Sequence, residues 1–164
     1  MKLTTSFVAL ATLTILTLST PLQALAGAGA PGHDHPSTSA FGEPGDPKKP
    51  ARVVNIVMRD TDGKMQFIPS SLMIKKGEQV RFLIANKGLL THEIVLGTVE
   101  ANIKHAAEMV KNPDMEHEDP NAKRIESSKS NEIVWKFTTA GQFDYSCLIP
   151  GHREAGMFGT IVVN

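Results

Sequence analysis

Residues 145–157 of the chain read YSCLIPGHREAGM and link two segments in which apolar and polar residues alternate. The segment holds the single cysteine of the chain, Cys147, with His152 five positions later and Met157 five positions after that. The Pro-Gly pair before the histidine predicts a turn that brings its imidazole back toward the sulfur. Because thiolate, imidazole and thioether all bind metals, this loop is a candidate metal site between two strands.

The predicted strands are short runs with a period of two, separated by turn signals such as Asp62-Gly63 and Lys76-Gly77. In each run the large apolar residues share one parity: Val54, Ile56 and Met58; Val80, Phe82 and Ile84; Ile133, Trp135 and Phe137; Phe143 and Tyr145; Ile161 and Val163. Several short strands with one apolar face each are typical of an all-β sandwich or barrel. Pro69 indicates an edge strand or a bend.

One segment breaks the period of two. From Thr98 the apolar residues fall three and four apart, which predicts a helix with Glu100 in its first turn and Pro113 at its end. The apolar positions of this helix are Val99, Ile103, Ala106, Ala107 and Val110. Residues 111–131 are then polar and irregular before the next strand. We therefore expect residues 98–131 to form one helical insertion on the surface of the sandwich.

A fourth candidate ligand, His92, lies far before the loop in the sequence. It follows the turn at Asn86-Lys87-Gly88 and shares parity with Ile94 and Leu96, so its side chain should face the core at a strand end. Together with Cys147, His152 and Met157 it forms the ligand set of a type 1 copper centre. Zinc does not favour the thioether, so the expected cofactor is one copper ion, as Cu(I) or Cu(II). Ligands fixed by strands suit electron transfer, because the ion can change charge with little rearrangement.

Enzymatic alternatives use the same residues in other ways. Cys147 with His152 would also suit a thiol nucleophile and its base. Nothing nearby in the sequence predicts an oxyanion hole or a helix N-terminus that would activate the sulfur. A copper oxidase or reductase needs further copper centres, and the chain lacks a His-Cys-His run. We expect a protein that is not an enzyme.

Other histidines and methionines raise the question of a second copper site. His105 and Met109 are four residues apart on the predicted helix and share a face, and Met115 and His117 follow it. We favour a solvated surface for these residues. The alternative is a second, exposed copper site formed by His105, Met109, Met115 and His117. For His33 and His35 we likewise favour the simpler interpretation, a polar linker; the alternative is a flexible metal-binding motif in the tail.

The amino-terminal residues predict export. Residues 3–18 are uncharged and largely apolar, and Ala24-Leu25-Ala26 follows them, so residues 1–26 are predicted to be a cleaved signal peptide. The apolar run is shorter than the roughly 20 residues that cross a bilayer, so we expect no membrane span after cleavage. Residues 27–50 are rich in glycine and proline and are predicted to be a disordered tail. The folded domain would then span residues 51–164.

The composition excludes some partners. The chain has 164 residues, with 17 Lys and Arg against 17 Asp and Glu, so it has no basic field for nucleic acid. A single cysteine cannot form an intramolecular disulfide, and the fold must depend on its apolar core. We expect a monomer whose partners are the copper ion and a redox or copper-transfer protein.

These motifs together resemble a cupredoxin over nearly all of residues 51–164. The resemblance rests on Met65-Gln66-Phe67-Ile68-Pro69, Lys76-Gly77-Glu78, Asn86-Lys87-Gly88, His92 and the Cys147 to Met157 loop. The loop spacing, with Ile-Pro-Gly before the histidine, is similar to that of rusticyanin and auracyanin. The resemblance implies a Greek-key cupredoxin β-sandwich with four ligands, of which His152 is the solvent-side ligand for electron transfer. It also implies an apolar patch around that ligand, formed by Leu89, Leu90, Leu148, Ile149 and Phe158.

The secretory signal, the histidines of the tail, the segment Thr91-His92-Glu93-Ile94-Val95-Leu96-Gly97 and the helical insertion resemble the periplasmic copper-tolerance cupredoxins of the CopI type. This resemblance implies a periplasmic protein that sequesters copper or passes electrons in a copper-detoxifying reaction. Two other functions remain open at this stage. The protein would otherwise be a soluble electron carrier between respiratory redox partners, or a copper chaperone.

Overall fold

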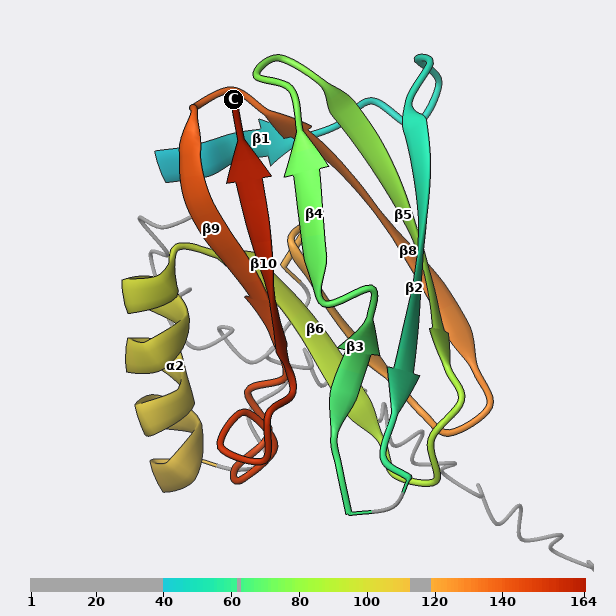
Figure 1. Ribbon diagram of the computed structural model, residues 1–164, viewed down its shortest axis with the longest axis vertical. Helices are drawn as coiled ribbons and strands as arrows, with labels where there is room; N and C mark the ends of the chain where they lie inside the picture. The colour runs from blue at the N-terminus through green and yellow to red at the C-terminus, as the bar shows by residue number, and fades with distance from the viewer. Residues whose placement is uncertain (1–39, 62, 113–118) are drawn as a thin grey trace, which may run out of the picture. The chain divides into compact units, whose positions relative to one another are not determined.

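A computed structural model describes residues 40–61, 63–112 and 119–164, which form a β-sandwich of two five-stranded sheets (Figure 1). The first sheet has the order β1 (Gly42–Pro44), β8 (Ser130–Phe137), β5 (Gln79–Asn86), β2 (Arg52–Arg59) and β3 (Gln66–Ile68). The second has the order β4 (Ser71–Ile74), β10 (Phe158–Val163), β9 (Gly141–Ser146), β6 (His92–Gly97) and β7 (Ala122–Ile125). The predicted all-β sandwich is confirmed.

The core lies between the two sheets and consists of the residues that share a parity in each strand. Pairing of β5 with both β2 and β8 aligns these positions across the first sheet. The side chains buried there include Ile56, Met58, Val80, Phe82, Ile84, Ile133, Trp135, Phe137, Phe143, Tyr145, Ile161 and Val163. Val54 is only partly buried at the edge of this cluster. Alternation along the sequence therefore predicts the buried face of each of these strands.

The folded domain begins earlier than the sequence predicts. Phe41 is fully buried, and its ring stacks on Trp135 with centroids 5.0 Å apart. The adjacent strand β1 pairs with β8, so a disordered tail that extends to Pro50 is wrong for residues 41–50. Strand pairing and one buried aromatic ring offset the chain entropy that the Gly- and Pro-rich composition implies. Residues 1–39, with the predicted signal peptide and the rest of the tail, lie outside the described residues.

Helix α2 (Val99–Lys111) forms where the apolar spacing predicts it and covers the outer side of β6. The Thr98 hydroxyl accepts a hydrogen bond from the Ala101 amide, 3.1 Å away, and so caps the helix. The buried side chains of the helix are Asn102 and Met109, whereas apolar Ile103 is 54% exposed. The helix therefore packs through a polar and a thioether side chain, and much of its apolar stripe faces solvent.

The predicted irregular stretch from 111 to 131 contains a strand. Strand β7 pairs with β6 at the edge of the second sheet, with Ile125 opposite His92. Only Ala122 and Ile125 of this four-residue strand are buried, which is too few for a visible period of two.

In the described part of the chain no helix is both long and apolar enough to cross a membrane.

Candidate metal centre

Strand pairing brings the predicted ligands to one end of the second sheet. His92 is the first residue of β6, Cys147 directly follows β9, and Met157 directly precedes β10. Strand β9 pairs antiparallel with both β6 and β10, with its last residue, Ser146, opposite Phe158 of β10 and Val95 of β6, so the chain that follows Ser146 runs toward His92. Sheet register thus juxtaposes residues that are 55 positions apart in sequence, His92 and Cys147.

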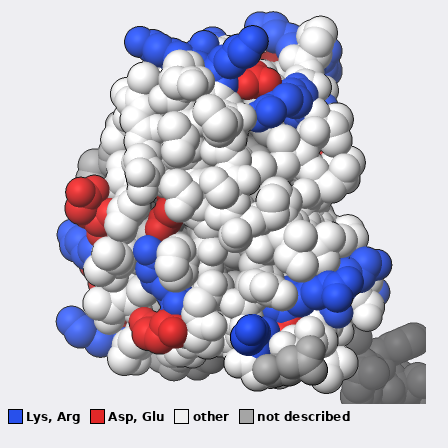
Figure 2. Space-filling view, in the orientation of Figure 1, with Lys and Arg blue, Asp and Glu red and all other residues white. Residues whose placement is uncertain are grey.

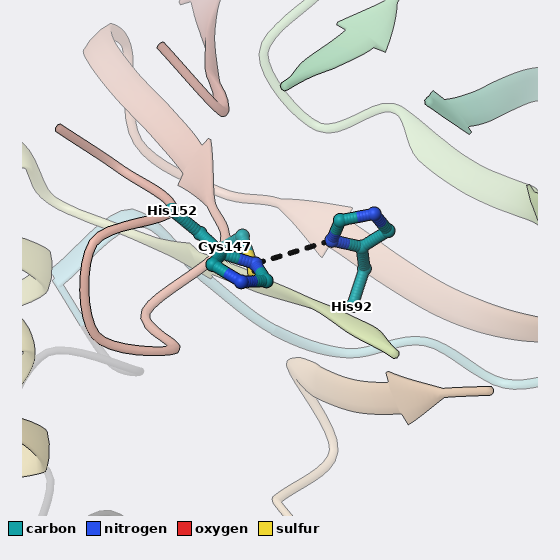
Figure 3. A group of neighbouring side chains, drawn as sticks. All are labelled: His92, Cys147 and His152. Carbon is teal, nitrogen blue, oxygen red and sulfur yellow. Dashed lines mark hydrogen bonds between the residues drawn. The ribbon is translucent and has the colours of Figure 1, made fainter. Parts of the chain in front are cut away.

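Three of the four predicted ligands meet at this point (Figure 3). The Nδ1 atom of His152 lies 3.2 Å from Nδ1 of His92 and 3.3 Å from Sγ of Cys147. One ligand atom from each of the three side chains lies within 4.8 Å of the other two. His92 and Cys147 are fully buried, and His152 is half-buried.

The loop that carries His152 is held by its own backbone. The Cys147 amide donates to the Met157 carbonyl, and the Met157 amide donates to the His152 carbonyl, each over 3.0 Å. Gly151 and Gly156 have φ angles of 86° and 99°, in the left-handed region that glycine adopts without strain. Met157 is fully buried, and its backbone is bonded to both other candidate ligands of the loop.

Asp60 orients His92 and was missed by the sequence analysis. Its Oδ2 atom lies 3.2 Å from Nε2 of His92, and the carboxylate accepts hydrogen bonds from the amides of Leu89 and Leu90 at distances from 2.6 to 2.9 Å. Burial alone would raise the pKa of Asp60, but these amides and His92 hold it below its usual value. The ionised carboxylate accepts a hydrogen bond from the Nε2–H group of His92, which leaves Nδ1 of His92 with a free lone pair.

Buried Asn86 fixes the turn that precedes His92. Its Nδ2 donates to the carbonyls of Leu90 and Ile125 over 2.8 and 2.9 Å, and its Oδ1 accepts from the Gly88 amide over 2.9 Å. One side chain thus ties both ends of the turn and a neighbouring strand together. The position of His92 at the start of β6 follows from this anchor.

Glu93 connects β6 to the residues on either side of the sulfur. Its amide lies 3.4 Å from Sγ of Cys147 and donates to it, and its carboxylate accepts from the Leu148 amide over 2.9 Å. Burial raises the pKa of Glu93, while the Leu148 amide and the charge of Arg124 lower it. The residue after His92 therefore supplies a backbone donor to the sulfur of Cys147.

The protonation of these groups favours metal binding over nucleophilic chemistry. Burial raises the pKa of the Cys147 thiol to about 12, although the amides of Glu93 and Ile149 act against this shift. Catalytic cysteines have a lowered thiol pKa, so a thiol nucleophile is not favoured here. Burial also lowers the pKa of His92 and His152, and a neutral imidazole is the form that binds a metal.

The donor set fits copper. Atoms bound to one ion through bonds of about 2.0 to 2.3 Å lie about 3 to 4 Å apart. The separations of 3.2 and 3.3 Å at His152 fall in this range. Two imidazoles and one buried thiol are the equatorial ligands of a blue-copper site, and the adjoining buried Met157 supplies a thioether.

Residues 54–164 match the family of copper-binding proteins that contains plastocyanin and azurin. The chain belongs to this family. This cupredoxin is 50% identical over 131 residues to the copper-resistant cuproprotein CopI of Rubrivivax gelatinosus, covering 80% of this chain and 78% of that protein. It is 32% identical over 153 residues to the copper-resistant cuproprotein CopI of Pseudomonas aeruginosa, covering 76% of this chain and 82% of that protein.

Among solved structures, auracyanin B superposes on this cupredoxin with a TM-score of 0.60 and 23% identity, covering 75% of this chain and 96% of auracyanin B. That likeness concerns the fold. The cupredoxin resemblance expected from the loop spacing and from the CopI-like features is confirmed by these comparisons.

Of the four residues proposed for a second site, the structure describes only His105 and Met109. Met109 is fully buried and packs with Val95, Ala122 and Leu148 in a second apolar cluster, so it does not belong to an exposed site. His105 is half-buried on α2, while Met115 and His117 lie outside the described residues. The tail residues His33 and His35 lie outside them too.

The apolar patch expected around the loop is partly present. Leu89 is 83% exposed, and Leu90 and Phe158 are each 47% exposed. Ile149 is half-buried, and Leu148 is only 1% exposed. Placing Leu148 in the patch was wrong, because helix α2 covers it with Met109.

Proposed function

We propose that this cupredoxin binds one copper ion through His92, Cys147, His152 and Met157 and serves in copper tolerance. The observation that carries the proposal is the meeting of His92 with Cys147 and His152 in a buried site. Met157 completes the set because it is buried and its backbone is bonded to both loop ligands. Its relatives are named copper-resistant cuproproteins, which supports the wider role.

We further propose that the mature protein is exported to the periplasm and is not an enzyme. The export proposal rests on the apolar, uncharged run at residues 3–18 and the small residues that follow it. The non-enzymatic proposal rests on the buried thiol with its raised pKa and on relatives named as cuproproteins.

The residues around the site hold the ligands rather than perform chemistry. Bound copper would supply one-electron transfer through its bond to the Cys147 sulfur. Asp60 fixes the tautomer of His92, and the Glu93 amide donates to the sulfur. Burial of His92 and Cys147 excludes water from the ligand atoms. A site of this kind keeps its ligands in place whether the ion is held for sequestration or used for electron transfer.

The surface near the loop favours electron transfer to a partner as the second candidate function. Leu89, Leu90 and Phe158 expose apolar side chains close to the ligand-bearing turns. Figure 2 shows Lys and Arg side chains gathered at the end of the sandwich beyond β4, and further charged side chains of both signs at the end that carries the loop. An apolar surface beside the half-buried His152 suits the brief docking of a redox protein.

Copper loading of the purified mature protein tests the proposal. We expect one copper per chain and an intense thiolate-to-copper absorption that is lost in Cys147→Ser and in His92→Ala. His105→Ala is the matched control and should keep both the copper and the absorption. A wild-type protein that binds no copper, or binds it without this absorption, would overturn the proposal. Deletion of the gene separates the roles: copper tolerance predicts sensitivity to copper, and a respiratory carrier predicts a respiratory defect without copper stress.

A further inference from the structure

A buried ion pair ties the ligand loop to strand β9 and helix α2. Arg153 directly follows His152, and its Nη2 lies 2.8 Å from Oδ2 of Asp144. The same guanidinium donates through Nη1 to the hydroxyl of Ser146. On the helix, Asn102 donates through Nδ2 to the other oxygen of Asp144. The side chains of Arg153 and Asp144 are 15% and 4% exposed, so one shielded carboxylate joins the loop and the helix.

Helix α2 is held against the sheet at the same place. Asn102 also donates to the Val95 carbonyl of β6 over 3.1 Å. Gly97 permits this approach, because a Cβ there would lie 2.6 Å from Oδ1 of Asn102. Two turns further along the helix, Met109 packs in the second apolar cluster with Leu148, the residue after Cys147. The helix therefore contacts groups linked to both ends of the loop.

The loop itself has mainly local backbone bonds. The Ala155 amide donates to the Gly151 carbonyl, and the Gly156 amide donates to the Arg153 carbonyl. These bonds shape residues 151–156 but do not join them to the sheet. The Arg153 side chain does so, through its ion pair with Asp144 and its position 5.0 Å above the centroid of the Phe158 ring. Arg153 is thus a side-chain anchor beside His152.

The helix and the loop also lie next to each other on the surface. Ile103, Ala107 and Val110 of α2 line a groove of about 500 Å³ together with Arg153 and other residues near the loop. Figure 1 shows α2 running alongside the second sheet, with its carboxyl end near the loop between β9 and β10. The insertion is therefore placed to support the loop.

We propose that Arg153 and Asn102 are positioning residues through which helix α2 braces the ligand loop and fixes His152. The inference rests on the proposed copper function and assigns the helical insertion a role in it. The brace holds His152 at the distance from Cys147 and His92 that the structure shows. Without it, the turn with its two left-handed glycines would sample other positions of the imidazole.

Single substitutions at Arg153 and Asn102, each compared with a control substitution elsewhere, test whether these residues position His152. In Arg153→Met and Asn102→Ala we expect one copper per chain, but loss of Cu(I) to a chelator about ten times faster or more, with a changed visible spectrum and reduction potential. Asn102 hydrogen-bonds to β6 and β9, so its effect would reach the copper through Asp144 and Arg153. The controls are Arg81→Met, which breaks an ion pair with Glu132 in the other sheet, and Asn112→Ala at the end of α2.

Hydrogen exchange of the metal-free protein gives a second readout that needs no copper. The amides of residues 148–149 and 151–156 should exchange faster in Asn102→Ala than in the wild type or in Asn112→Ala. Arg153→Lys keeps the charge next to Asp144 but loses the forked donor, so it should fold and show an intermediate rate of copper loss. The proposal would be overturned if Arg153→Lys and Asn102→Ala released copper at the wild-type rate and kept the wild-type spectrum and the wild-type amide exchange of the loop. If the wild type binds no copper, the proposed function fails. The exchange rates still show whether Arg153 and Asn102 hold the loop in place.

Discussion

The carboxylate of Asp60 lies 3.2 Å from Nε2 of His92, on the side of the imidazole opposite to the nitrogen that faces His152. The carboxylate is fixed by the amides of Leu89 and Leu90, so it cannot follow a movement of the ring. A carboxylate behind a ligating histidine sets its tautomer and raises its basicity. The arrangement of Asp60 and His92 therefore orients Nδ1 of His92 toward the proposed copper site in the metal-free protein.

Replacing the charge at Asp60 should weaken copper binding. In Asp60→Asn we expect the affinity for Cu(II) to fall by about 10- to 100-fold. The reduction potential should rise, because the carboxylate of Asp60 stabilises Cu(II) over Cu(I) and the variant lacks that negative charge. Competition with a chelator and voltammetry measure the two effects. Asp46→Asn, at an exposed turn, is the control. Equal copper affinities and reduction potentials in the two variants would contradict the role of Asp60.

Copper binding should release a proton from Cys147. Burial raises the pKa of this thiol to about 12, so the metal-free protein carries a thiol at neutral pH while the metal requires a thiolate. Calorimetry at pH 7 in buffers with different ionisation enthalpies should show about one proton released per copper. The copper affinity should accordingly rise with pH. Binding without proton release would mean that the sulfur is not a ligand.

The stability effect of Arg153→Met should depend on pH. Burial raises the pKa of Asp144, and Arg153, Asn102 and Ser146 act to lower it. Removing Arg153 raises the folded-state pKa further, while the pKa in the unfolded chain is unchanged. The loss of stability is therefore complete above the folded-state pKa of Asp144 in the variant and shrinks as the pH falls toward its folded-state pKa in the wild type. We expect a loss of about 3 to 5 kcal/mol at pH 7 and a much smaller loss near pH 4.

Denaturant titrations of the metal-free protein at the two pH values check this expectation. Adding Asp144→Asn to Arg153→Met removes the unpaired charge and should recover part of the stability at pH 7. A loss that is equal at both pH values would show that the carboxylate of Asp144 is not what the guanidinium stabilises.

Phe41 should contribute to stability although it lies in a Gly- and Pro-rich segment. Its ring is fully buried between Trp135 and Phe143, with centroid distances of 5.0 and 5.4 Å. Phe41→Ala should lower the free energy of unfolding by about 3 to 5 kcal/mol. Val53→Ala, at a side chain that is 52% exposed, should change it by about 0.5 kcal/mol or less. Similar melting temperatures for the two variants would show that the domain does begin near residue 51.

The parts of the fold that alternation predicts are those in which a strand has one buried face. In β8, the residues Ile133, Trp135 and Phe137 alternate with partly or fully exposed ones, and the sheet follows that pattern. Strand β7 carries no such signal, because it is short and has two buried residues. Phe41 was missed for a different reason: the composition of a segment averages over its residues, whereas a single ring can anchor a chain end.

The residues of the candidate site were also only partly predictable from the sequence. Cys147, His152 and Met157 lie close together in sequence, so spacing alone indicates a shared role. His92 could be added because its parity places it inside. Asp60 could not, because its approach to His92 depends on where the end of β2 meets the turn after β5, which no local pattern encodes. The bonds of Arg153 with Asp144 and Asn102 likewise arise from packing between three separate elements.

A crystal structure of the copper-loaded protein, with anomalous data collected at the copper edge, would show directly whether the four proposed ligands bind the ion. We expect one strong copper peak bonded to Nδ1 of His92, Nδ1 of His152 and Sγ of Cys147, with the Met157 sulfur as the fourth ligand. A copper peak at His105 or elsewhere, with these side chains free of metal, would contradict it.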